Sequence, residues 1–370
     1  MSNESVETTN ERSARRKRPV VVLGATGAVG QRFLQLLTDH PWFEVSALAA
    51  SEQSAGRPFS EACRWGLPGE IPPGIADRVV RTLDPEDVRR EIPGSCPIAF
   101  SALPAAVARE VESRFAQAGY AVVSNVSAYR YEPDVPLVIP EVNPEHLLLI
   151  DRERARRSWP GFIVTNPNCT TAGIALAVKP LDEAFTIERV FAATLQAVSG
   201  AGYPGVASLD ALGNVVPYID GEEEKIERET RLLLGRITDG ARTEAELLVS
   251  AQAHRVPVID GHTVSLSLQF ERRPSPAEAI DVLSGFRGSE TVRGLPSAPD
   301  PPIIVRHEAD RPQPRLDRDA GGGMAISVGR VRTCPLLDLR MVVVSHNTVR
   351  GAAGASLLNA ELLVAEGWIV

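Results

Sequence analysis

Apolar residues near the start of the chain follow first a continuous and then a helical pattern. Residues 20–23 are uninterruptedly apolar, which is typical of a strand buried on both faces. In the next segment apolar side chains recur at i, i+4, i+7 and i+8, one face of a helix: Val29, Phe33, Leu36 and Leu37. The run FEVSALAAS predicts a second strand. Together these segments predict a βαβ unit with a glycine-rich first turn.

The same alternation continues as far as residue 165. The run CPIAFSAL predicts a strand, a helix follows with Val107, Val111 and Phe115 on one face, and YAVVSN predicts the next strand. Strands that alternate with helices form parallel sheets with right-handed crossovers. We therefore predict an α/β protein in which residues 19–165 form a Rossmann-like, doubly wound dinucleotide-binding domain.

Beyond residue 165 the strand-like runs become longer and cluster together, as in IERVFAATLQAV, AHRVPVIDGHTVSLSLQFE and PLLDLRMVVVSH. This pattern predicts an α+β catalytic and dimerisation domain over residues 166–346, with a largely antiparallel sheet. Such a sheet must bury one face, so we expect dimerisation through this domain. The final helical segment, residues 347–370, is expected to pack back on the first domain.

Composition and charge limit the partners of the chain. A hydrophobic content of 44% and a charged content of 23% are typical of a globular protein, and a net charge of −8 argues against nucleic acid or an anionic membrane. No apolar run approaches the roughly 20 residues of a membrane span. Residues 1–18 are polar, end in a basic cluster and lack an apolar signal core. We expect them to form a disordered tail on a cytoplasmic protein.

The first turn of the βαβ unit carries Gly24, Gly27 and Gly30 with the spacing G-x-x-G-x-x-G. Backbone N–H groups at the start of the following helix can bind a pyrophosphate, and Gly30 allows the helix to pack closely on the strand. The alternative is a purely structural turn, although the position between a buried strand and a helix favours a dinucleotide site. The second strand ends in AASEQSAG, where Ser51 and Ser54 can bind a 2′-phosphate and Glu52 argues the other way. NADP is the expected cofactor, with NAD possible.

The four cysteines of the chain, Cys63, Cys96, Cys169 and Cys334, are far apart and show no CxxC pair. This spacing fits neither a zinc site nor a disulfide framework, so no metal is expected. A free cysteine is most often a small buried hydrophobic residue, which is our interpretation of Cys96. Cys169 differs because TNPNCTTAG places it at a strand-to-helix junction.

At this junction Asn168 is a predicted N-cap and Pro167 stiffens the turn. A helix N-terminus stabilises an anion by about 0.3–1 kcal/mol, or by up to about 2 kcal/mol when it is partly buried. One pKa unit corresponds to about 1.4 kcal/mol, so the helix alone lowers a thiol pKa by about one unit at best. A thiolate at neutral pH therefore needs a base or a cation nearby.

The six histidines include one candidate for that partner. No two of them show the HxxxH spacing of a helical metal site. His262 follows a glycine in VIDGHTV, between two strand-like runs, with Arg255 seven residues before it. A histidine that only satisfies a turn is the alternative interpretation, and the need of Cys169 for a partner favours the catalytic one.

Seven motifs in this order resemble the archaeal and fungal branch of the aspartate-semialdehyde dehydrogenases: LGATGAVGQRF, SNVSAYR, TNPNCTTAG, LQAVSGAGYPG, HRVPVIDGHT, DRPQPRLDRD and HNTVRGAAGASLLNAE. The resemblance spans the chain from Pro19 to its last residue. It implies interconversion of 4-phosphoaspartate and aspartate 4-semialdehyde with NADP(H) and inorganic phosphate, by a homodimer or a homotetramer.

The resemblance also implies a role for each motif residue. The nucleophile would be Cys169, the acid/base His262 and the residue that positions the reacting group Gln196. Substrate and phosphate binding would fall to Arg130, Asn168, Arg255, Glu222 and Lys225, although EEEK offers three glutamates for one role. The expected cofactor contacts are Gly24, Thr26, Gly27, Ala28, Val29, Gly30, Ser51, Ser54, Ser101, Leu103, Ser199, Gly200 and Asn347.

Two positions depart from the family pattern. Gln53 stands where some relatives carry a basic residue between the two serines, which removes a charge-assisted contact to a 2′-phosphate. Thr170 stands where serine is frequent, and it keeps the hydroxyl.

Three other functions remain open at this point. A reductase of coenzyme A thioesters, such as malonyl-CoA reductase, would share the cysteine, the histidine and the cofactor but need no phosphate pocket. A thiol hydrolase would use Cys169 and His262 without nicotinamide, and a non-catalytic dinucleotide sensor would leave Cys169 unreactive.

Overall fold

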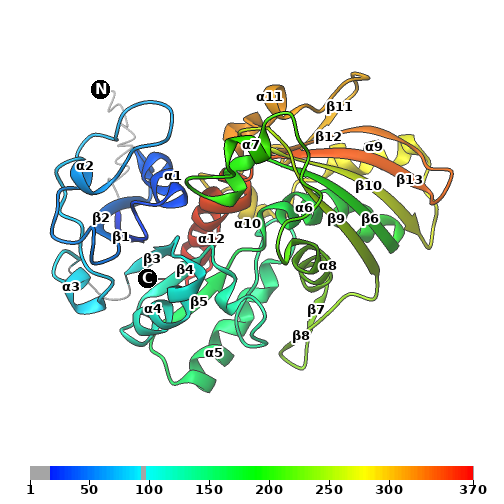
Figure 1. Cartoon of the computed structure of the whole chain (residues 1–370). Helices are drawn as coiled ribbons and strands as arrows, with labels where there is room; N and C mark the ends of the chain where they lie inside the picture. Colours follow the sequence, from blue (N-terminus) through cyan, green and yellow to red (C-terminus); the bar gives the residue numbers. More distant parts are fainter. Residues whose placement is uncertain (1–16, 93–96, 370) are drawn as a thin grey trace, which may run out of the picture.

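The structure is a computed structural model that describes residues 17–92 and 97–369. Residues 1–16 of the predicted tail and Cys96 lie outside the described residues, and Arg18 is already the first residue of strand β1. The described residues form two large sheets, which lie side by side in Figure 1, and a two-stranded sheet.

The first sheet has five parallel strands in the order β2-β1-β3-β4-β5. Its strands are β1 (Arg18–Leu23), β2 (Phe43–Ala49), β3 (Ile98–Ser101), β4 (Ala121–Ser124) and β5 (Phe162–Thr165). The helices around it are α1 (Ala28–Leu37), α2 (Phe59–Ala62), α3 (Pro85–Arg89), α4 (Ala105–Gln117) and α5 (Leu149–Arg157), with single turns η1 (Ser127–Tyr129) and η2 (Pro144–Leu148). The predicted doubly wound α/β fold is confirmed.

Successive residues of β1 point into two different cores because side chains alternate between the faces of a strand. Val20 and Val22 pack with Phe33 of α1, whereas Val21 and Leu23 pack with Phe115 of α4. Both faces of the sheet are therefore covered, which explains the continuous apolar run that predicted the strand.

The second sheet has six strands in the order β11-β12-β13-β10-β6-β9. Its strands are β6 (Ile187–Gln196), β9 (Leu248–Arg255), β10 (His262–Phe270), β11 (Ile303–Arg306), β12 (Ile326–Thr333) and β13 (Leu339–Ser345). The three central pairings are antiparallel, as predicted, while the outer pairs β11–β12 and β6–β9 are parallel. The sheet is therefore mixed, with an antiparallel centre.

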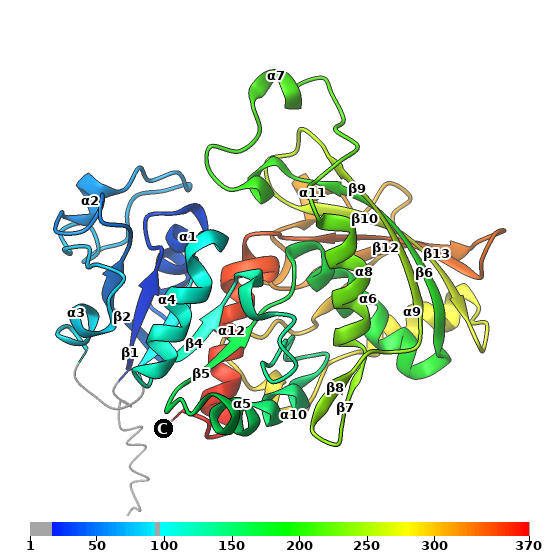
Figure 2. The ribbon, with the colours of Figure 1, turned by 60° about the horizontal axis from the view of Figure 1, so that its bottom comes forward.

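Three helices share one core with this sheet: α6 (Cys169–Phe185), α8 (Glu222–Leu233) and α9 (Pro276–Gly285). Phe191 and Leu195 of β6 point the other way and remain 38% and 42% exposed, so the opposite face keeps apolar side chains at the surface. Figure 2 shows a long loop with α7 (Ser208–Ala211) projecting from the body beside this sheet. The smaller elements are the hairpin β7 (Arg236–Thr238) and β8 (Ala241–Thr243), α10 (Glu290–Arg293), α11 (Pro314–Asp317) and the turns η3 (Val198–Ala201) and η4 (Ala320–Gly323).

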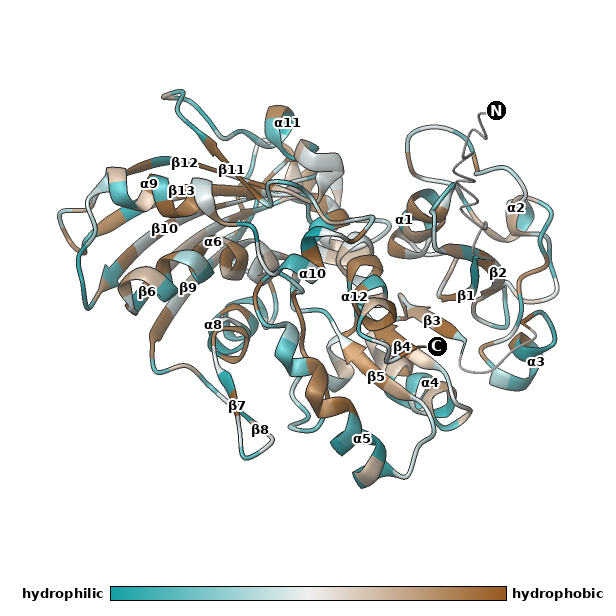
Figure 3. Ribbon diagram, turned by 180° about the vertical axis from the view of Figure 1, so that it is seen from behind, coloured by the Kyte–Doolittle hydropathy of each residue, from teal (hydrophilic) through white to brown (hydrophobic). Residues whose placement is uncertain are grey.

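The end of the chain returns to the first sheet. After the π-helical turn η5 (Val349–Ala353), helix α12 (Gly354–Ala365) buries Leu357, Leu358 and Leu362 in the core that contains Val20 and Phe33. Figures 1 and 3 show α12 beside β4 and β5, and its ribbon is largely in the hydrophobic colours of Figure 3. The division of the chain into domains at residues 165 and 347 stays a prediction. Among the described helices, none has both the length and the hydrophobicity of a membrane span.

A fully buried ion pair fastens η5 to the rest of the molecule. The guanidinium of Arg350 donates to both carboxylate oxygens of Glu141, at 3.1 and 2.6 Å, and its Nε donates to the carbonyl of Met324. Arg350 has no exposed surface and Glu141 is only 5% exposed. Removing one partner of such a pair leaves an uncompensated charge in the interior.

We expect Glu141→Ala to lower the free energy of unfolding by about 3–5 kcal/mol, because Arg350 stays buried without its counter-charge. Urea unfolding followed by circular dichroism measures the change. Glu145→Ala, an exposed glutamate four residues away, is the control and should change the stability by less than about 0.5 kcal/mol. Equal unfolding curves for the two variants would contradict the expectation.

Candidate active site

Helix α6 begins at Cys169 because Asn168 caps it. Asn168 has extended backbone angles, and its Oδ1 accepts hydrogen bonds from the N–H groups of Thr170 and Thr171 at 2.8 and 3.2 Å. Pro167 separates this cap from the end of strand β5 at Thr165. The predicted N-cap and the position of Cys169 in the first turn of a helix are confirmed.

Cys169 and His262 are in contact, as predicted. The Sγ atom of Cys169 lies 3.3 Å from Nε2 of His262, which is the first residue of β10. The backbone N–H of Ala197 donates to Nδ1 of the same ring at 3.0 Å. Since Nδ1 accepts a hydrogen bond, the proton of the neutral ring is on Nε2 and faces the sulfur. His262 is therefore arranged as a hydrogen-bond donor toward Cys169.

Both groups of this pair are uncharged in the free site at neutral pH. Burial and, to a smaller extent, the carboxylate of Glu222 raise the pKa of the Cys169 thiol to about 12, although Arg130 and Arg255 act in the opposite direction. Burial lowers the pKa of His262 to about 3, and the charges of Arg255 and His346 act in the same direction. Desolvation thus outweighs the lowering of the thiol pKa expected from the helix N-terminus.

Helix α8 brings one of the three candidate glutamates to this site. Both oxygens of Glu222 accept from Nδ2 of Asn168, at 2.9 and 3.0 Å, and one of them accepts from the hydroxyl of Thr170 at 3.3 Å. Glu223 instead accepts from the N–H of Ala253 in β9, away from the thiol. The structure therefore places Glu222 at the site, and Thr170 uses the hydroxyl that it shares with serine.

Arg255 and His262 lie directly behind the turn at Gly200. A Cβ atom on Gly200 would lie 2.8 Å from Nη1 of Arg255 and 3.1 Å from Cε1 of His262. Nη1 of Arg255 donates to the carbonyl of Ala197 at 2.8 Å, while Gln196 is buried and donates to the hydroxyl of Thr194. The structure brings Arg255 to the pair and leaves the amide of Gln196 engaged within its own strand.

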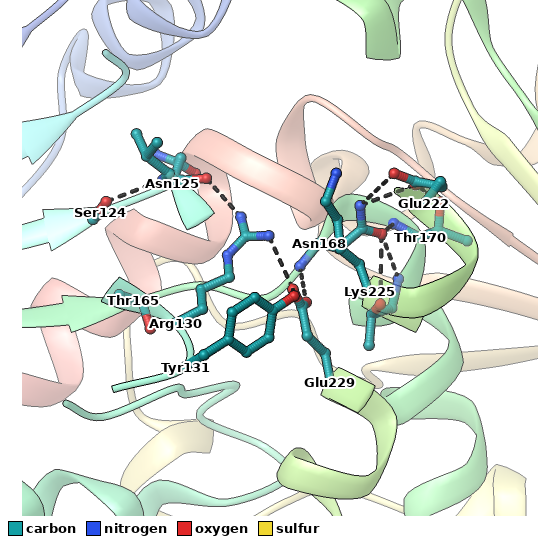
Figure 4. A network of polar contacts seen from close by, with 12 residues as sticks. Ser124, Asn125, Arg130, Tyr131, Thr165, Asn168, Thr170, Glu222, Lys225 and Glu229 are labelled. Atoms are coloured by element: carbon teal, nitrogen blue, oxygen red, sulfur yellow. Dashed lines mark hydrogen bonds and ion pairs between the residues drawn. The ribbon is translucent and has the colours of Figure 1, made fainter. Parts of the chain in front are cut away.

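Arg130 reaches the site from the first sheet and is held by a residue that the motifs do not include (Figure 4). Its Nη2 donates to the carbonyl of Asn125 at 2.7 Å, and its Nη1 donates to Glu229 at 3.2 Å. Glu229 lies on α8 four residues after Lys225 and seven after Glu222, positions that share one face of a helix. That spacing is the signal by which the sequence could have revealed it.

Arg130, Asn168 and Cys169 line a cavity of about 640 Å³ between the two sheets. The residues that line it do not include Glu222, Arg255 or His262. Its wall includes ten of the predicted residues: Ala28, Val29, Leu103, Arg130, Asn168, Cys169, Ser199, Gly200, Lys225 and Asn347. The first residues of α1 therefore open on the same space as the thiol. The helix N-terminus and the carboxyl ends of parallel strands in this wall are the groups that would hold a dinucleotide.

Gly24 and Gly30 are required by the backbone of the first turn, because a side chain at either position would collide with main-chain atoms. Gly24 has φ +78°, and a Cβ there would lie 2.5 Å from the carbonyl oxygen of Ala102. A Cβ on Gly30 would lie 2.2 Å from the carbonyl oxygen of Gly24, which agrees with the predicted close packing of helix and strand. Gly27 is the N-cap of α1, and its N–H donates to the carbonyl of Gly24.

The remaining candidates for cofactor binding lie around this turn. Ser51 and Ser54 occupy a turn after β2, with Ser51 exposed and Ser54 half-buried. The carbonyl of Thr26 accepts from the side chain of Gln31. Ser101 is fully buried, and its hydroxyl donates to Glu112 at 2.6 Å, so this hydroxyl is committed to the protein interior.

A parallel nucleotide-type sheet and a cysteine–histidine pair at one cavity define the class of thiol-dependent nicotinamide dehydrogenases. The family models described as "Semialdehyde dehydrogenase, NAD binding domain" and "Semialdehyde dehydrogenase, dimerisation domain" match residues 19–150 and 178–350. The chain belongs to the semialdehyde dehydrogenase family.

Relatives with high identity carry one name. The aspartate-semialdehyde dehydrogenase of Methanothermobacter thermautotrophicus is 54% identical over 93% of this chain and 98% of that protein. The Candida albicans protein of the same name is 47% identical over 94% of this chain and 98% of that protein. A crystal structure of the Candida albicans enzyme with NADP matches with a TM-score of 0.87 and 45% identity, covering 95% of this chain and all of that chain. The resemblance noted in the sequence is confirmed.

We expect alkylation of Cys169 by iodoacetamide to rise about tenfold per pH unit from pH 7 to at least pH 9, because the thiolate is the reactive form and its pKa lies higher. Mass spectrometry of the labelled peptide in ligand-free protein measures the rate. The matched control is Cys334 in the same sample, a thiol whose pKa the N–H groups of Leu336 and Leu337 help to lower against the effect of burial. If the alkylation rate of Cys169 levels off below pH 8, the conclusion that the pKa of this thiol is raised is wrong.

We also expect Gly351→Ala to reduce turnover by about 100-fold, because the new Cβ would lie 2.6 Å from Cβ of Cys169 and must displace the nucleophile. Steady-state kinetics with the substrates of the family measure the loss. Gly285→Ala, at a glycine with open space around it, should stay within about twofold of the parent. Unchanged turnover in Gly351→Ala would show that the nucleophile does not depend on this contact.

Proposed function

We propose that the chain catalyses the NADPH-dependent reductive dephosphorylation of 4-phospho-L-aspartate to L-aspartate 4-semialdehyde, in the biosynthesis of lysine, threonine and methionine. The observation that carries the proposal is the contact of Cys169 with His262 at a cavity that Arg130 and Lys225 also line. A thiol, two cations and a dinucleotide-type helix N-terminus are the groups that this reaction needs.

In the first half-reaction the thiol of Cys169 gives up its proton and its sulfur attacks the carbonyl carbon of the acyl phosphate. The C–S bond forms, the bond between the carbonyl carbon and the phosphate oxygen breaks, and the phosphate takes up the thiol proton as it leaves from a subsite of Arg130 and Lys225. Arginine suits the phosphate because its planar fork donates two parallel hydrogen bonds. Arg255 binds the substrate carboxylate, and Glu222 binds the ammonium group.

In the second half-reaction the thioester is reduced and the C–S bond breaks. NADPH, which Ala28 and Val29 at the start of α1 would help to hold, would supply the hydride for this reduction. The Nε2–H group of His262 donates a hydrogen bond first to the oxygen of the reacting carbonyl and then to the departing sulfur. The N–H of Ala197 keeps the ring in the tautomer that allows this. Arg130 and Arg255 favour the thiolate that is released, because their charges lower the pKa of Cys169. Gln196 and Asn168 keep the positioning roles that the family resemblance implies.

NADP is the proposed cofactor. The Candida albicans enzyme at 45% identity was crystallised with NADP. Ser51 and Ser54 follow strand β2, where the ribose of a dinucleotide lies in this fold. Their hydroxyls are the proposed contacts of the 2′-phosphate, with Gln53 between them in place of a cation.

The assembly that we propose is a homodimer, or a tetramer of dimers, formed through the second sheet. The family model over residues 178–350 is described as a dimerisation domain, and the outward face of β6 keeps Phe191 and Leu195 exposed. Covering such an apolar face removes it from water. Location in the cytoplasm stays a prediction.

The test is NADPH formation from aspartate 4-semialdehyde and NADP, with and without inorganic phosphate. We expect a strictly phosphate-dependent increase in absorbance at the wavelength of NADPH, and no turnover in Cys169→Ala, because the acyl phosphate can form only from the thioester and phosphate. Oxidation of NADPH by malonyl-CoA without such an increase would instead assign the chain to the coenzyme A thioester reductases.

A further inference from the structure

The carboxylate of Glu229 is completely enclosed and accepts hydrogen bonds from three directions (Figure 4). Glu229 has no exposed surface. Its Oε1 accepts from Nη1 of Arg130 at 3.2 Å and from the hydroxyl of Tyr131 at 3.0 Å. Its Oε2 accepts from the backbone N–H of Asn168 at 2.5 Å. One side chain of α8 therefore joins the segment that carries Arg130 to the residue that precedes Cys169.

Two of these partners belong to the active site. Arg130 lines the cavity, and the peptide of Asn168 leads directly into the first turn of α6. The geometry points to Glu229 as the positioning residue of the phosphate subsite, since it sets the distance between the guanidinium of Arg130 and the thiol of Cys169. This inference rests on the proposed function, because it assigns the anion at Arg130 as phosphate.

The remaining donors of Arg130 are consistent with this role. An arginine has five N–H groups, of which Nη1 gives one to Glu229 and Nη2 gives one to the carbonyl of Asn125. Its Nε is buried and has no protein partner within the described part of the chain. Glu229 and Asn125 thus hold the guanidinium on one side and leave N–H groups for an anion.

The backbone around Arg130 is held separately. Nη2 of Arg242, in strand β8, donates to the carbonyl oxygens of Arg130 and Glu132 at 3.0 and 2.6 Å. With the main chain supported from this hairpin, the direction of the Arg130 side chain depends on Glu229 and Asn125. A change at Glu229 is therefore transmitted to the guanidinium rather than to the fold of the turn.

Only a carboxylate satisfies all three donors, because both of its oxygens are acceptors. A glutamine has the same shape but carries one oxygen and one NH₂ group. In Glu229→Gln the NH₂ group must face either the N–H of Asn168 or the donors Arg130 and Tyr131, so one of the two active-site contacts is lost.

The experiment compares Glu229→Gln with Glu227→Gln in the phosphate-dependent oxidation of aspartate semialdehyde. Glu227 lies on the same helix, and its Oε1 accepts from the N–H of Ala251 in β9 at 3.0 Å. The amide oxygen of glutamine can keep this single bond, so the control removes one carboxylate of α8 without removing a contact to the active site. We expect the KM for phosphate to rise at least about tenfold in Glu229→Gln, with the KM for the semialdehyde within about threefold of wild type. Glu227→Gln should leave both constants unchanged.

Three results would overturn the inference. A KM for phosphate that falls would mean that the Glu229 charge repels the anion or competes for Arg130. Equal effects of the two substitutions, or parallel changes in both KM values, would mean that Glu229 serves stability alone. Wild-type enzyme is measured in parallel, so that a failure of the proposed function can be told from a failure of the role of Glu229. If the wild-type enzyme shows no phosphate-dependent turnover, the proposed function itself is wrong.

A second variant covers the case in which Glu229→Gln does not fold. Tyr131→Phe keeps the carboxylate of Glu229 and removes the hydroxyl that donates to its Oε1. Because the same oxygen accepts from Arg130, the guanidinium is then held less firmly. We expect a selective rise of about threefold in the KM for phosphate, the size of a single hydrogen bond. The same comparison can be made without turnover, by measuring the phosphate concentration that protects Cys169 against alkylation. If wild type and Tyr131→Phe need the same concentration, the inference is wrong.

Discussion

The active site depends on how the first turn of α6 is held. Asn168 caps this turn with its side-chain oxygen, while its amide and its backbone N–H donate to two carboxylates of α8, Glu222 and Glu229. Two anions in a closed interior need cations nearby, and Arg130 supplies one of them from the other sheet. The position of the nucleophile and the approach of the two sheets are therefore set by one polar network.

The interior around Cys169 acts on charge in two opposite ways. Low polarity raises the pKa of the thiol and lowers that of His262, so the free site carries an uncharged pair. The same surroundings strengthen every donor that faces a developing negative charge. Since Ala197 holds His262 with Nε2–H toward the sulfur, the site is prepared for the anionic forms that arise during the reaction rather than for the resting thiol.

Features that depend only on residues close together in the sequence could be predicted from it. The cap at Asn168 follows from residue types within one turn, and the strand at 20–23 follows from burial on both faces. The contact of Cys169 with His262 spans 93 residues and was expected because the motifs resemble a family. Glu229 and Asn168 are 61 residues apart, and Arg350 and Glu141 are 209 apart. The helical spacing after Glu222 and Lys225 marks Glu229 as a residue of the same face of α8, but no local pattern shows which distant residue it contacts. Only the packing of distant elements brings such pairs together. The parallel outer pairings of the second sheet were missed for the same reason.

The return of α12 to the first sheet has a consequence for synthesis of the protein. Leu357, Leu358 and Leu362 complete a core to which Val20 and Phe33 also belong, and those two residues leave the ribosome long before α12 does. On the face that α1 covers, the first sheet therefore lacks α12 while the second sheet is being made. Its early strands reach their final packing only after the ribosome has released the segment that covers them, so the nucleotide-binding half is the first to be made and the last to be finished.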